Sequence, residues 1–200
     1  PGSFNEKLSV LKLKRTNIAL WKYADKIEVR TYVEQTIGKN YLVPLIATYS
    51  SADEIDFKTL PNQFVIKTNH GSGWNIICRD KSTLNINTTI RKLNHWLSYN
   101  AFYLSREYQF KPIKPTLLCE EMLEYNIYDY KFFCFDGKPQ IVQLDVDRFT
   151  HHKRAFYDMS WEKQDFSIRY DISEKELTKP DKFEEMKELG LDGDESVNLS

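Results

Sequence analysis

The sequence predicts an α+β protein, because helical and strand patterns occupy separate stretches of the chain. Apolar residues recur at helical spacing through most of residues 4–60. A β-hairpin with a glycine-containing tip follows at residues 63–79, and strands with tight turns dominate residues 116–170. Helices and strands that are segregated in this way, rather than alternating, are typical of the α+β class.

The composition excludes several classes of protein. The 200 residues carry a formal net charge of −1 and are 41% hydrophobic, so a substantial core can form and no general electrostatic footprint for nucleic acid is present. No apolar stretch approaches the length of a membrane span. Cys78, Cys119 and Cys134 are widely spaced and lie in apolar runs, which predicts reduced core residues of a cytoplasmic protein.

The N-terminal part is predicted to be mainly helical. Residues 4–13 and 20–36 carry apolar residues at helical spacing, and Gly38 is suited to end the second helix. Residues 41–48 form a short apolar run around a proline, which favours a strand. Residues 53–60 begin with acidic residues and favour a short helix or turn.

The hairpin that follows has a long tip. Its predicted strands are residues 63–67 (QFVIK) and 75–79 (NIICR), joined by the loop of residues 68–74 (TNHGSGW). Asn87 is a candidate N-cap for a helix that runs through Ser98, because the apolar residues after it share one helical face.

The C-terminal part is predicted to form an antiparallel sheet. Asp136-Gly137 is the strongest turn signal in the chain and predicts a hairpin between its flanking strands. Residues 182–189 are predicted to be helical, and the polar residues from Gly190 onward a loose tail. The strands are expected at residues 116–123, 129–135, 138–147, 155–158 and 166–170.

The glycine loop, residues 67–73, is the first candidate site. Gly71 and Gly73 let the backbone approach an anion closely and direct N–H groups toward it. Lys67 supplies a positive charge and Ser72 a hydroxyl donor. The pattern is not a Walker loop. A flexible hairpin tip with a solvated lysine is the alternative that the pattern leaves open.

The second candidate site is the run of acids that ends a predicted apolar strand, at Glu120, Glu121 and Glu124. Acidic side chains are costly to bury without partners. If the strand leads into a linker between two lobes, its backbone can pair with a purine edge and a carboxylate can hold a ribose hydroxyl. A strand that simply reaches solvent explains the same residues equally well.

Two later strands carry the remaining candidates. Lys131 lies in a strand that we expect to be buried on both faces, so it needs a phosphate or an acidic side chain as partner. Gln143, Asp145 and Asp147 share one face of the next strand, and a basic cluster follows at residues 148–154. A carboxylate row beside basic residues suits a magnesium-phosphate site or an acceptor site. The alternative is a solvated strand face.

Together these segments resemble the TupA-like branch of the ATP-grasp superfamily, found among enzymes of bacterial surface-polysaccharide synthesis. The resemblance covers residues 4–189. It implies two lobes, with the glycine-loop hairpin lobe packed over an antiparallel sheet and ATP bound between them. The stretches that carry it are residues 24–30 with 41–44, 63–80, 118–123 and 129–154.

The resemblance also implies a division of the chain and roles for single residues. We expect a tag remnant at 1–3, an N-terminal helical segment at 4–60, a small lobe at 61–115, an incomplete central sheet lobe at 116–189 and a tail at 190–200. The implied ATP-binding residues are Arg30, Lys67, His70, Gly71, Ser72, Gly73, Glu120, Glu121, Met122, Leu123 and Glu124. Lys131 and Arg148 are the implied catalytic residues, and Asp145 and Asp147 the candidate magnesium ligands.

The implied reaction is carboxylate–amine ligation through an acyl phosphate, driven by ATP with magnesium. The implied acceptors are a uronic-acid-type saccharide and an amino acid or amine, neither of which the sequence identifies. An ATP-dependent kinase, a glycosyltransferase of a polysaccharide locus and a non-catalytic nucleotide-binding fragment are the alternatives.

The last residues lack a pattern that the resemblance leads us to expect. The late strands of the family would carry an acid and a Gly-Glu pair, whereas residues 190–200 contain acids without a strand pattern. We therefore expect weak magnesium-dependent nucleotide binding, little turnover, and an exposed apolar sheet edge that favours a homodimer.

Overall fold

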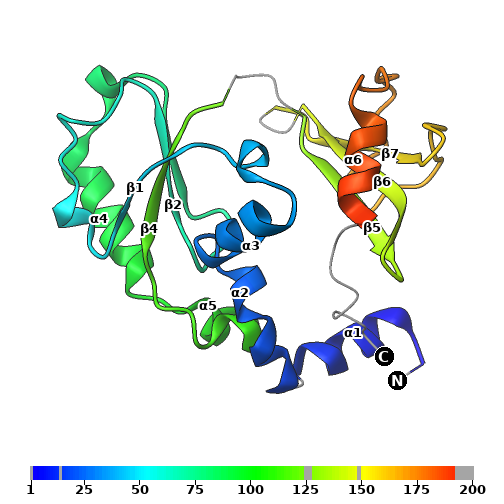
Figure 1. Ribbon diagram of the computed structural model, residues 1–200, viewed down its shortest axis with the longest axis horizontal. Coiled ribbons are helices and arrows are strands. Elements are labelled where there is room, and N and C mark those ends of the chain that lie inside the picture. The colour runs from blue at the N-terminus through cyan, green and yellow to red at the C-terminus, as the bar shows by residue number, and fades with distance from the viewer. Residues whose placement is uncertain (1, 14, 124–127, 148–149, 192–200) are drawn as a thin grey trace. The chain divides into compact units, whose positions relative to one another are not determined.

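Helices and two antiparallel sheets make up the computed structural model, as expected for the α+β class (Figure 1). It describes residues 2–13, 15–123, 128–147 and 150–191, in two units, Pro1–Leu123 and Glu124–Ser200. The helices are α1 (Phe4–Leu13), α2 (Trp21–Ala24), α3 (Glu28–Thr36), α4 (Ile86–Leu97), α5 (Ala101–Ser105) and α6 (Phe183–Leu191). The strands are β1 (Leu45–Tyr49), β2 (Phe64–Thr68), β3 (Asn75–Cys78), β4 (Leu117–Glu121), β5 (Tyr130–Phe135), β6 (Lys138–Val146) and β7 (Lys153–Asp158).

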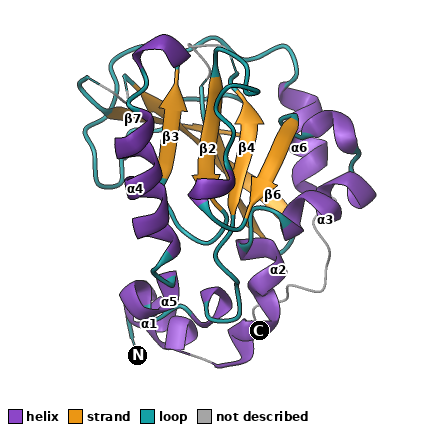
Figure 2. Ribbon diagram, turned by 90° about the vertical axis from the view of Figure 1, so that its left-hand side faces the viewer, coloured by secondary structure: helices purple, strands orange, loops and turns teal. Residues whose placement is uncertain are grey.

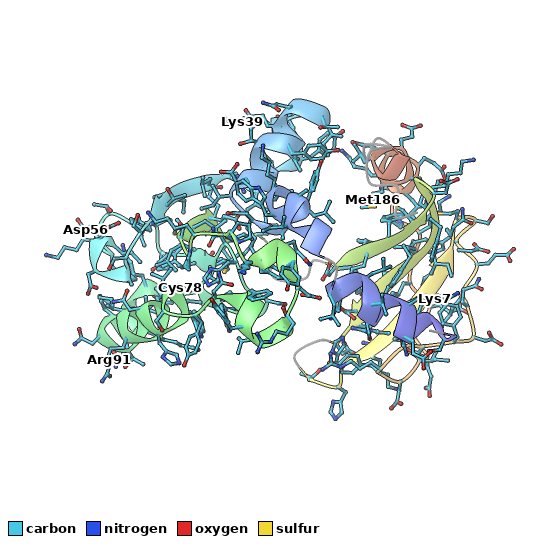
Figure 3. All side chains as sticks on the ribbon, turned by 90° about the horizontal axis from the view of Figure 1, so that it is seen from below. Lys7, Lys39, Asp56, Cys78, Arg91 and Met186 are labelled. Atoms are coloured by element: carbon cyan, nitrogen blue, oxygen red, sulfur yellow. The ribbon has the colours of Figure 1, made fainter. Side chains whose placement is uncertain are left out.

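The first unit is built on an antiparallel sheet in the order β1-β4-β2-β3. Helix α4 covers one face of this sheet, where the apolar core of the unit lies (Figure 2). Cys78 belongs to that core (Figure 3). The predicted hairpin of β2 and β3 is confirmed. Strand β4, which we expected at the start of the central sheet lobe, pairs with β1 and β2 in this unit.

The predicted helix of residues 20–36 is interrupted at Asp25. The backbone of this residue is extended, with φ −81° and ψ 117°, and its Oδ1 atom accepts a hydrogen bond from the Ile27 N–H at 2.8 Å. Aspartate favours this local bond over helical pairing. The interruption places Asp25 and Lys26 between α2 and α3, facing the glycine loop.

The N-cap of α4 is Asn85 and not Asn87. The Asn85 side chain accepts a hydrogen bond from the Thr88 N–H at 3.0 Å, the usual bond of an N-cap residue to the third helical position. The helix therefore begins two residues earlier than predicted.

The second unit is built on the antiparallel sheet β5-β6-β7. Asp136 and Gly137 form its first turn with positive φ values of 52° and 69°, as the Asp-Gly signal predicts. Val142, Leu144 and Val146 line the face of β6 that packs on Phe183 of α6. Figure 1 shows α6 lying along this sheet.

Several predictions for the second unit are wrong. Strand β5 is not buried on both faces, because Phe135 is 58% exposed, and the strand lies at the edge of its sheet. Cys134 is exposed there as well, unlike Cys78 and Cys119. Residues 166–170 form no strand, and the segment around them instead joins β7 through bridges at Lys163 and Ile172.

Candidate functional site

A buried carboxylate, Glu120, organises the face of the first sheet opposite α4. Its Oε1 accepts a hydrogen bond from Arg30 Nη1 of α3 at 2.7 Å, and its Oε2 accepts one from Lys67 Nζ of β2 at 2.6 Å. Antiparallel pairing places Glu120 opposite Val65, so Lys67 lies diagonally across on the same face. The Glu120 side chain is 6% exposed. The solvated-strand alternative is therefore wrong for Glu120, although Glu121 is exposed.

Positive charge exceeds negative charge around Glu120. Lys26 lies near Lys67, so with Arg30 the cluster holds three cations. Its carboxylates are the two of Glu120 and Asp25. Burial lowers the pKa of Lys26, and the positive charge of Lys67 lowers it further. The Lys67 side chain is 33% exposed. An anion that reaches it from solvent would therefore enter a region with an excess of positive charge.

The first half of the glycine loop is buried in the first unit, unlike an ordinary exposed hairpin tip. Thr68, Asn69 and His70 are at most 2% exposed. Asn69 explains this burial: its N–H donates to Thr116 O at 2.9 Å, its Oδ1 accepts from Thr116 N at 2.9 Å, and its Nδ2 donates to Asp25 Oδ2 at 2.9 Å. These partners are distant in sequence and give no local signal.

His70 is held inside the unit. Its Nε2 lies 2.9 Å from the carbonyl oxygen of Tyr99, and its Nδ1 lies 3.1 Å from Oδ1 of Asn69. Burial lowers the pKa of His70, which keeps the ring neutral at pH 7. Only the second half of the loop, Gly71 to Gly73, remains for contact with a ligand.

Gly71 is required by packing against Trp74. A Cβ atom on Gly71 would lie 2.2 Å from Trp74 Cε3, far inside contact distance. Gly73 has φ +75°, a conformation that favours glycine. Within the described residues, the backbone N–H groups of Gly71, Ser72 and Gly73 donate to no protein acceptor. The loop thus presents donors that an anion can bind.

An open depression of about 540 Å³ lies at the end of β4. Glu121 and Met122 form one side of it, and Gln63 at the start of β2 forms another. Leu123 follows and is exposed, while Glu124 lies outside the described residues. The strand end that was predicted to meet adenine therefore borders an accessible surface.

In the second unit, Asp145 accepts hydrogen bonds from several basic side chains. They come from Lys131 Nζ at 2.9 Å, Arg154 Nε at 2.8 Å and His152 Nε2 at 3.0 Å. Gln143 Nε2 donates at 3.2 Å. Burial opposes ionisation of Asp145, but the bonds from Lys131, Arg154 and His152 outweigh it and hold its pKa well below the usual range.

The structure does not bring the candidate magnesium ligands together. Asp147 follows the end of β6 with φ +49°, is exposed, and pairs with Lys175 Nζ at 2.7 Å. The alternative of a solvated strand face is also wrong for Gln143 and Asp145, which are at most 7% exposed. Within the described residues, no group of three His, Cys, Asp or Glu side chains could hold a metal ion. Arg148 lies outside the described residues.

Some residues of these clusters were not singled out as site residues. Lys26, Asp25 and Asn69 have no local pattern that separates them from surface polar residues. His152 and Arg154 were noted only as part of a basic cluster, and the antiparallel register of β6 and β7 places Arg154 opposite Asp145. Tyr170 packs on both, with ring centroids of His152 and Tyr170 3.9 Å apart.

The first unit of this α+β protein thus places glycine-loop N–H groups that have no acceptor among the described residues in the same unit as a cationic cluster. The chain belongs to the TupA-like ATP-grasp family, whose model matches residues 6–192. Membership supports an ATP-binding enzyme of the general ATP-grasp type. No curated protein and no solved structure matched the chain. None of the described helices is long and apolar enough to cross a membrane.

Proposed function

We propose that this chain is an ATP-dependent carboxylate–amine ligase whose ATP phosphates bind at Arg30, Lys67 and the backbone of Gly71 to Gly73. One observation carries the proposal: the partly exposed Lys67, paired with a buried carboxylate, precedes a loop whose N–H groups at Gly71 to Gly73 have no acceptor in the described part of the chain. Cations and backbone donors held in place stabilise charge on transferring phosphoryl groups.

The adenine end of the nucleotide is proposed to bind at Glu121, Met122 and Leu123. The depression beside Glu121 and Met122 supports this position. Backbone groups at the end of a strand can pair with a purine edge, and the exposed Glu121 carboxylate can accept a ribose hydroxyl.

The family generally uses ATP and magnesium. Asp145 and Asp147 are engaged with separate cations, so the described carboxylates do not fit a shared magnesium site. Lys131 is ion-paired with Asp129 and Asp145, which raises its pKa despite partial burial and keeps it protonated. A protonated Lys131 can neutralise charge on a bound phosphate or carboxylate.

The reaction is proposed to proceed through an acyl phosphate, with a role in bacterial surface-polysaccharide synthesis. A substrate carboxylate oxygen attacks the γ-phosphorus and ADP leaves. An amine then attacks the acyl carbon, phosphate leaves, and the amine gives up a proton as the amide forms. The chain residues contribute positioning and charge stabilisation to these steps.

Lys67→Met is expected to weaken ATP binding about 10- to 150-fold, because it removes a charge-assisted contact while keeping the aliphatic stem. Calorimetric titration with ATP measures the change. Lys39→Met, at an exposed lysine of the same unit, is the matched control and should bind as the unaltered chain does (Figure 3). Equal affinities for the two variants would show that Lys67 does not bind the phosphates.

A further inference from the structure

Lys26 is attached to the glycine loop by both its backbone and its side chain. Its N–H donates to Asn69 O at 3.1 Å, and its ammonium group lies 3.5 Å from the same oxygen. The ammonium group also donates to the carbonyl oxygen of Gly71. A single residue between α2 and α3 therefore holds two carbonyl groups of a loop more than forty positions later in the chain.

The bond to Gly71 fixes the direction of the next N–H group. A trans peptide unit is planar, so its C=O and N–H groups point in opposite directions. The peptide between Gly71 and Ser72 has its oxygen on Lys26, and its N–H, on Ser72, points away from the ammonium group. Ser72 is exposed, and within the described residues this N–H has no acceptor.

The surroundings of Lys26 keep it in this position. Asp25 Oδ2 accepts from Asn69 Nδ2 at 2.9 Å, and Asp25 Oδ1 accepts from the N–H of Ile27 at 2.8 Å, just before α3. On the other side of the loop, Trp74 packs where a side chain on Gly71 would lie. Rotation of the peptide between Gly71 and Ser72 would break the bond from Lys26 to the Gly71 carbonyl.

We propose that Lys26 is a positioning residue that turns the Ser72 N–H toward the phosphates of the bound nucleotide. The inference rests on the proposed function, since it concerns the same phosphate site. It assigns a role to a residue that touches the loop and not the ligand. The two carbonyl groups occupy two of the three ammonium donors of Lys26, whereas Arg30 and Lys67 pair with Glu120.

Lys26→Met tests this role, and Lys22→Met, at an exposed lysine of α2, is the matched control. In the free protein, Lys26→Met should shift the Gly71 carbonyl and Ser72 amide resonances in NMR spectra. The amides paired between β2 and β3 should keep their positions. Unchanged Gly71 and Ser72 resonances would overturn the inference, whatever the variant does with ATP.

The second arm compares ATP with adenosine by calorimetry. Lys26→Met should lose about tenfold in affinity for ATP and none for adenosine, because only the phosphates meet the loop. Lys26→Arg should restore most of the loss, since it returns a cationic donor. Equal losses for ATP and adenosine, or no loss for either, would show a purely structural role and overturn the inference.

The two arms separate the inference from the proposed function. If the unaltered chain binds no ATP while Lys26→Met still shifts Ser72, the assignment of nucleotide to this site is wrong, and the positioning role toward phosphate is overturned with it. If the unaltered chain binds ATP and the Lys26 variants bind ATP as tightly as Lys22→Met does, the positioning role alone is wrong. Should Lys26→Met fail to fold, Lys26→Gln replaces it with the same expected outcomes.

Discussion

Asp145→Asn is expected to destabilise the second unit by about 3 kcal/mol. The Asp145 side chain is 3% exposed and accepts hydrogen bonds from Lys131, His152 and Arg154. Removing its charge leaves partly buried cations without a carboxylate, which is costlier than losing a surface ion pair. Hydrogen exchange of the β6 amides, measured at increasing urea concentrations, gives the change in the free energy of unfolding.

Asp129→Asn is the matched control for this variant. Asp129 also pairs with Lys131, but its side chain is 45% exposed, so its loss should cost less than about 1 kcal/mol. The folded-state pKa of Asp145 is depressed, so its contribution is present above the unfolded pKa and is lost as pH falls through the folded pKa. The difference in the free energy of unfolding between Asp145→Asn and the unaltered chain should therefore become smaller below about pH 4. A difference in unfolding free energy that is independent of pH would contradict this account.

Glu120→Gln is expected to destabilise the first unit by about 2–4 kcal/mol. The substitution leaves Arg30 and Lys67 facing each other without the carboxylate that both contact. Thermal unfolding measures the loss. Glu121→Gln, at the exposed neighbour, should change stability by less than about 0.5 kcal/mol.

Inorganic phosphate should restore part of the stability lost in Glu120→Gln. An anion that binds only the folded state stabilises it by an amount that grows with the anion concentration relative to its dissociation constant, and the excess of positive charge is larger in this variant. Phosphate should therefore raise the unfolding temperature of Glu120→Gln more than that of the unaltered chain. Equal responses of the two proteins would show that the cluster is not an anion site.

Local patterns predicted the elements that depend on neighbouring residues. The hairpin of β2 and β3, the turn at Asp136-Gly137 and helix α6 all follow from spacing within a few residues. The family resemblance, carried by the same stretches, is confirmed over residues 6–192.

The features that sequence reasoning missed depend on distant partners. The helix interruption at Asp25 and the burial of Asn69 explain each other, because the two side chains are hydrogen-bonded across 44 positions. Burial of Asp145 depends on the segment near Tyr170, which packs on His152 and Arg154. The periodicity of β6 does not indicate which segment will cover its face. The sequence alone therefore did not distinguish a buried Asp145 from a solvated one.

The central claim is that nucleotide phosphates bind at the glycine loop beside Lys67. Hydrogen exchange of the chain, alone and with saturating ATP or adenosine, tests it most directly. The account predicts that ATP slows exchange at the amides of Gly71, Ser72 and Gly73 and at the end of β4, because these N–H groups gain acceptors, while adenosine slows exchange only at the end of β4. ATP binding that leaves the Gly71 to Gly73 amides as fast as in the free chain would contradict it.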